Sequence, residues 1–177
     1  AGAIYEELER AANAGDAARS AQAFGDLKDR YPRTLQAQQG GLLAAKVLAD
    51  KGKPDEALAA LAWLAEKAPE DEYKIVARLR AAGLLMDKKQ YDPALAQLDA
   101  AAGGSVREFD ALIADRRGDV LLAQGKKADA LAAYQRAYKG MQAKDDYRNL
   151  IDAKLTALGA APEATPAAAA SAPGAAK

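Results

Sequence analysis

Hydrophobic positions between residues 110 and 138 form two stripes at helical spacing, separated by a polar turn. The turn contains Gly125, Lys126 and Lys127, and the small residues Gly118 and Ala130 lie within the stripes. The apolar members are Leu112, Ile113, Leu121, Leu122, Ala130, Leu131, Tyr134 and Ala137. Because positions three and four apart share one helix face, this stretch predicts two antiparallel helices that approach closely at the small residues.

The same arrangement recurs at two places upstream. In each copy two small residues lie 12 positions apart, and each is followed three or four positions later by a larger apolar residue. The pairs are Ala45 with Ala57, Ala82 with Ala94, and Gly118 with Ala130. Their second members lie 37 and 36 residues apart, so three copies stand in register, which indicates a repeat array.

A helix-turn-helix repeat of about 34 residues with small residues at these places is typical of tetratricopeptide arrays. We therefore predict an all-α, right-handed tetratricopeptide-like solenoid of about four helix pairs over residues 1–158. The units span about 1–32, 33–69, 70–104 and 105–140, and a capping helix over 144–158 seals the core with one apolar face. A capping box from Ser105 to Glu108 is expected to open the fourth unit.

The last residues differ in composition from the rest of the chain. From Gly159 to Lys177 the sequence is dominated by Ala, Pro, Gly and Ser, with three prolines and no apolar residue larger than Ala or Pro. Such a segment cannot bury enough apolar surface to offset the entropy of ordering. We therefore predict a disordered tail over 159–177.

Composition excludes several classes of function. Lys+Arg and Asp+Glu both total 25, giving zero formal net charge, so a surface for nucleic acid or anionic lipid is not expected. His and Cys are absent, which excludes disulfides, Cys nucleophiles, His bases and the common zinc and haem sites, and leaves cytosol and periplasm equally open. The carboxylate pairs at 71–72 and 145–146 fall at expected helix starts, where acids stabilise the dipole. We predict a non-enzymatic chain without metal or cofactor.

The sequence carries no obvious membrane anchor of its own. It contains no run of about 18 apolar residues, the length that would span a bilayer. It does not begin with Met and starts inside an expected helix over 3–12. We therefore expect it to be a fragment or a processed form.

A protein-binding groove is the expected functional site. The first helix of each unit lines the concave face of such an array. The expected lining residues are Gln39, Leu42, Lys46, Asp50, Val76, Leu79, Gly83, Met86, Asp87, Leu112, Asp115, Asp119 and Leu122. The groove would take an extended or helical segment and be apolar with an acidic end, but several of these residues could instead pack against a neighbouring or capping helix.

A few further residues allow two interpretations. Trp63 lies off the adjacent leucine stripe, so it could anchor a partner or pack between units. Arg116 and Arg117 lie beside two aspartates and could bind a partner or form an internal ion-pair network that fixes helix stacking. The internal role is favoured in each case. Gly40 and Gly41 lower helix propensity, so we expect close packing at these positions to compensate.

Several segments resemble one family. Residues 114–125, ADRRGDVLLAQG, are similar to the ADxRGDxLLxxG segment of YfgM-like proteins, the ancillary subunits of the SecYEG translocon. Residues 77–80 with 90–95 resemble their third unit, and 31–32 with 44–46 and 52–57 resemble their second. The resemblance covers about residues 1–158, and Arg117-Gly118 is its most distinctive part, since ordinary repeats favour Leu before that Gly.

This resemblance implies a bacterial inner-membrane protein with a periplasmic repeat domain. One N-terminal transmembrane helix would lie upstream of Ala1, and the domain would sit beside the SecYEG channel and meet periplasmic chaperones or secreted chains. The alternative is a free soluble tetratricopeptide adaptor or assembly factor that is not tied to the translocon. A self-assembling scaffold is a third alternative.

Overall fold

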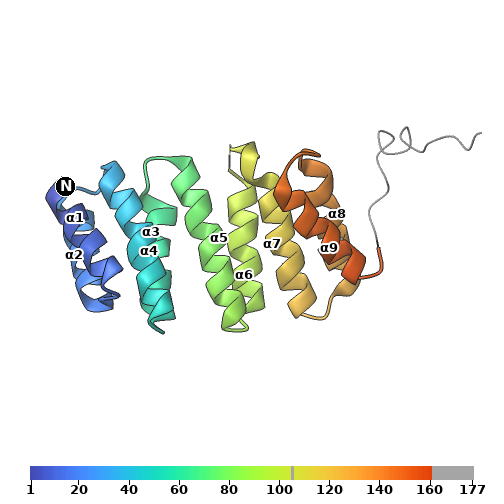
Figure 1. The fold of residues 1–177 in the computed structure, drawn as a ribbon, viewed down its shortest axis with the longest axis horizontal. Coiled ribbons are helices and arrows are strands. Elements are labelled where there is room, and N and C mark those ends of the chain that lie inside the picture. The colour runs from blue at the N-terminus through green and yellow to red at the C-terminus, as the bar shows by residue number, and fades with distance from the viewer. Residues whose placement is uncertain (105, 161–177) are drawn as a thin grey trace, which may run out of the picture.

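The computed structural model describes residues 1–104 and 106–160, and in these residues the regular secondary structure is entirely helical. Successive helices pair as antiparallel hairpins, and Figure 1 shows the pairs side by side along the long axis, from α1–α2 to α7–α8, with α9 after them. The helices are α1 (Gly2–Asn13), α2 (Ala17–Arg30), α3 (Leu35–Asp50), α4 (Pro54–Lys67), α5 (Asp71–Asp87), α6 (Tyr91–Ala102), α7 (Asp110–Ala123), α8 (Lys127–Gly140) and α9 (Asp146–Ala157). The predicted all-α solenoid is confirmed.

The turn inside each hairpin repeats the spacing seen in the sequence. A residue with positive φ closes each one: Gly15, Gly52, Lys89 and Gly125. These positions are 37, 37 and 36 residues apart, as the small residues predict. Glycine adopts this left-handed conformation freely, and Lys89 is the one non-glycine residue that does so in the described part of the chain.

Three helices begin next to a residue whose side chain accepts a hydrogen bond from a free backbone N–H group of the first turn. Asp16 and Thr34 accept backbone hydrogen bonds at the starts of α2 and α3, and Asp145 does so at α9. Helix α9 therefore lies within the stretch 144–158 assigned to the capping helix. Before α7 the chain forms a 3-10 turn, η1 (Arg107–Phe109). The expected capping box includes Ser105, and the tail prediction concerns mainly residues 161–177; both fall outside the described residues.

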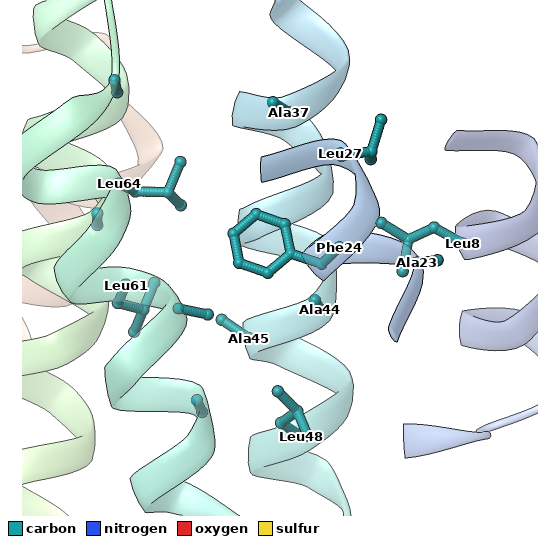
Figure 2. Packing of buried hydrophobic residues seen from close by; sticks show 14 of the residues in the cluster. Leu8, Ala23, Phe24, Leu27, Ala37, Ala44, Ala45, Leu48, Leu61 and Leu64 are labelled. Atoms are coloured by element: carbon teal, nitrogen blue, oxygen red, sulfur yellow. The ribbon is translucent and has the colours of Figure 1, made fainter. Parts of the chain in front are cut away.

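The core consists of successive clusters along the array. The first joins α1 to α5 and includes Leu8, Phe24, Leu27, Leu61 and Leu64, whose packing Figure 2 shows. A second joins α5, α6 and α7, and a third joins α7, α8 and α9. Each helix pair therefore buries its apolar faces against its neighbours, as expected for a solenoid.

The adjacent glycines of α3 lie where helices approach closely. A Cβ atom at Gly40 would come within 2.8 Å of Leu27, and one at Gly41 within 2.9 Å of Leu64. Close packing therefore compensates their low helix propensity, and this expectation is confirmed.

The internal roles expected for Trp63 and Arg117 are also confirmed. Trp63 is half-buried and its ring lies 5.5 Å from that of Phe24 in an edge-to-face arrangement that joins α4 to α2. Arg117 of α7 forms an ion pair with Asp99 of α6, which joins the third pair of helices to the fourth. Arg116 lies 3.9 Å from Asp119 on its own helix.

Over the described ranges, every helix is too short or too polar to cross a lipid bilayer.

Candidate protein-binding groove

Two neighbouring hollows lie between the odd-numbered helices, and together they form what we call the groove. The α5–α7 hollow has a volume of about 310 Å³, and the α3–α5 hollow about 390 Å³. Arg80 and Gly83 of α5 line both hollows. The groove therefore crosses α3, α5 and α7 and passes over the middle of α5.

The α5–α7 hollow has an apolar floor with charged groups at its rim. Its apolar lining residues are Val76, Leu79, Ala82, Gly83 and Met86 of α5, Phe109 of η1, and Leu112 and Val120 of α7. Arg80, Arg116 and Asp119 complete the lining. A cavity of this kind accepts an apolar side chain and offers charged partners beside it.

The α3–α5 hollow is more polar at one end. Lys46 and Asp50 form an exposed ion pair with 2.8 Å between Nζ and Oδ2, and Asp87 lies near them at the end of α5. Across the hollow, Arg80 donates a 3.3 Å hydrogen bond to the carbonyl oxygen of Leu42 on α3. This contact positions the Arg80 side chain between the two hollows.

Gly83 leaves space at the centre of the groove. A Cβ atom at this position would meet no atom within 4 Å, although the residue lies in the middle of α5. At Gly118, in contrast, a Cβ atom would lie 2.5 Å from the ring of Tyr134. Gly118 is thus required by the packing of α7 on α8, whereas Gly83 leaves room that a bound segment could fill.

Helix α9 packs against the middle of α7 through a cluster of polar side chains. Lys154 of α9 donates hydrogen bonds to Asp115 at 2.8 Å and to Asp119 at 2.9 Å. Tyr147 also bonds to Asp115, and Tyr134 of α8 donates a 2.7 Å bond to Asp119. We call these five residues the capping cluster.

The capping cluster raises the pKa of its two phenols. Burial raises the pKa of Tyr134 above its ordinary value of 10.0, and the hydrogen bond to Asp119 raises it further. Burial and the bond to Asp115 act in the same way on Tyr147. Both phenols therefore stay protonated in the folded chain at pH values where an exposed tyrosine ionises.

Stability is expected to fall above about pH 10, because the unfolded chain then loses phenolic protons that the folded chain retains. The folded state binds more protons than the unfolded state in this range, so the free energy of unfolding decreases as pH rises. Urea midpoints between about pH 8 and 11 measure this decrease. The double variant Tyr134→Phe/Tyr147→Phe should lose stability less steeply over the same range, and parallel curves for the two proteins would contradict the assignment.

Nine of the thirteen groove residues expected from the sequence line a hollow, and four do not. Val76, Leu79, Gly83, Met86, Leu112 and Asp119 line the α5–α7 hollow, and Lys46, Asp50 and Asp87 line the α3–α5 hollow. Gln39 and Leu42 are half-buried on α3, and Leu122 is 40% exposed near the end of α7; none of the three lines either hollow.

Asp115 lies outside the groove. It is fully buried and bonded to Lys154 and Tyr147 of α9. The capping helix therefore satisfies a carboxylate that repeat spacing alone would place among the ligand-facing residues.

Sequence reasoning missed several groove residues. Arg80 lies four positions after Val76 and three before Gly83, on the helix face that these residues define, and it lines both hollows. Arg116 was not among the expected groove residues, because an internal ion pair was favoured for it over partner binding. Phe109 lies in η1, before the helix that the pattern predicts. A helical stripe indicates which residues face a groove but not how far long side chains reach.

The groove offers apolar surface and cationic groups for binding. No group of three or more His, Cys, Asp or Glu side chains in the described residues could hold a metal ion. The groove instead combines apolar floor residues with exposed guanidinium groups from separate helices. Repeat folds of this kind are generally non-catalytic.

Comparison with protein families finds a match over most of the chain. A family described as tetratricopeptide repeat-like domain matches residues 1–160. Comparison with curated protein sequences gives no match.

Proposed function

Because the chain belongs to the tetratricopeptide repeat-like domain family, we propose that it is a protein-interaction module whose groove binds a segment of a partner protein. The observation that carries this proposal is the groove itself, which crosses α3, α5 and α7 and is unfilled at Gly83. An extended or helical segment laid across several repeats can contact each of them, so many weak contacts add up to useful affinity.

We further propose that the module acts at the periplasmic face of a bacterial inner membrane, as a tethered accessory of the SecYEG translocon. The similarity of residues 114–125 to a segment of YfgM-like proteins supports this assignment, together with the shorter similarities at 31–32, 44–46, 52–57, 77–80 and 90–95. Partners would then be the channel, periplasmic chaperones or emerging secreted chains. A tether would raise the local concentration of the groove near the channel, so modest intrinsic affinity would suffice.

The tethered role is tested by purifying the natural full-length protein from gently solubilised membranes and identifying co-purifying proteins by mass spectrometry. Recovery of the secretion channel and periplasmic chaperones is expected. Recovery from the soluble fraction without channel subunits would contradict the translocon role and leave the alternative, a free soluble tetratricopeptide adaptor or assembly factor.

Filling the groove should abolish partner binding while the fold remains intact. We expect Gly83→Phe to lower partner recovery about tenfold or more, because the new ring occupies the space at the centre of the groove. The same experiment with Gly25→Phe is the matched control, since a Cβ atom at Gly25 in α2 also meets nothing within 4 Å. Equal recovery with the two variants would show that partners bind elsewhere.

A further inference from the structure

The charged groups at the rim of the α5–α7 hollow differ in how strongly other residues of the chain bind them through hydrogen bonds and ion pairs. Asp119 contributes the negative charge there, and its Oδ1 atom accepts hydrogen bonds from Tyr134 at 2.7 Å and from Lys154 at 2.9 Å. Lys154 is shared with the buried Asp115. The carboxylate of Asp119 is therefore held by the capping cluster and is poorly placed to attract a ligand cation.

The two arginines at the rim are less engaged. Arg116 is half-exposed, and its Nη1 atom lies 3.9 Å from Asp119 Oδ2, beyond hydrogen-bond distance. Arg80 is exposed and forms no ion pair within the described residues, where its one hydrogen bond is the 3.3 Å contact with the Leu42 carbonyl. Most of the donor positions on both guanidinium groups thus remain available.

These arginines stand on different helices and border the same apolar floor. Arg80 comes from α5 and Arg116 from α7, and Leu79, Met86 and Leu112 line the same hollow. Guanidinium groups bind carboxylates through paired, charge-assisted hydrogen bonds. An apolar side chain on the floor would bring a neighbouring carboxylate of the same segment to the rim.

Resting on the groove function proposed above, we infer that the α5–α7 hollow selects partner segments in which an apolar residue is flanked by Asp or Glu. The apolar residue fills the hollow, and the acidic side chains bind Arg80 and Arg116. The continuation of the groove into the α3–α5 hollow favours an internal segment over a chain end, because the ligand can run on across α5.

The inference is tested by selecting short random peptides on the full chain, and by counter-selecting on the groove-filled variant Gly83→Phe. The groove-dependent peptides are expected to carry Asp or Glu beside an apolar residue. One of them is then compared with its Gln-substituted copy by fluorescence anisotropy. The acidic peptide should bind about tenfold tighter, and the difference should shrink as salt is added.

The double variant Arg80→Met/Arg116→Met should remove this preference, so that the acidic and Gln peptides bind alike. Arg10→Met/Arg136→Met is the matched control, because it removes two exposed charges outside the groove and should leave the preference unchanged. The methionines keep most of the apolar stem, and both variants lower the net charge equally.

The results separate the two proposals. Groove-dependent peptides without acidic residues, or an acidic preference that survives in Arg80→Met/Arg116→Met, would overturn this inference and leave the groove function standing. Peptides that all bind Gly83→Phe as well as the native chain would overturn both.

Discussion

Replacing Lys154 with methionine is expected to lower the free energy of unfolding by about 3 kcal/mol, because it leaves the fully buried Asp115 without its cation. The same change removes the cation from Asp119, so two carboxylates on adjacent turns of α7 would repel each other. Chemical denaturation measures the loss. Hydrogen exchange should locate it in α8 and α9, since repeat arrays unfold locally.

The matched control is Lys46→Met, which breaks the exposed pair with Asp50. Both side chains are more than 60% exposed, so this change should cost less than about 1 kcal/mol. Adding Asp115→Asn to Lys154→Met should restore part of the lost stability, because the buried charge is then gone. Equal effects of Lys154→Met and Lys46→Met would mean that the capping cluster contributes no more than a surface pair.

Replacing Gly118 with alanine is expected to destabilise the chain by about 2 kcal/mol, although alanine favours helix. The added Cβ atom would lie 2.5 Å and 2.6 Å from two ring atoms of Tyr134. Tyr134 is 1% exposed, and Asp119 accepts a hydrogen bond from its hydroxyl, so the ring cannot move away without losing that bond. Urea denaturation at neutral pH measures the change.

Gly83→Ala is the comparison for this prediction. It also places alanine in the middle of a first helix, but its Cβ atom meets nothing within 4 Å. It should therefore raise stability by up to about 1 kcal/mol through helix propensity alone. A Gly118→Ala chain as stable as the native one would show that α7 and α8 can separate slightly without cost.

The helix pairs could be predicted from the sequence because their determinants are local and repeated. Ala45, Ala82 and Gly118 recur at one spacing, and the turn residues at 15, 52, 89 and 125 recur at the same spacing. Lys89 shows that the register of the repeat, rather than a glycine at each turn, sets the backbone there.

The groove could be predicted only in part. Periodicity correctly assigns a face to residues such as Gly83 and Leu112, which do line a hollow. It cannot show that Asp115 is buried under α9, because this depends on Lys154 and Tyr147 from a helix more than 30 residues away. It also cannot show that Arg80 reaches across to Leu42 on α3, since side-chain reach depends on the spacing between helices.

The capping cluster also determines how the array could be lengthened. In the described residues of α5 and α7 the one buried charged side chain is Asp115, which bonds to α9. A copied helix pair inserted between the third and fourth pairs would therefore meet apolar stacking surfaces. A pair added after α9 would meet a helix whose buried face is already committed to α7 and α8 through Lys154, Ile151 and Leu155. The molecule is thus modular in its interior and closed at its end, and changes in repeat number should be tolerated only on the N-terminal side of α7.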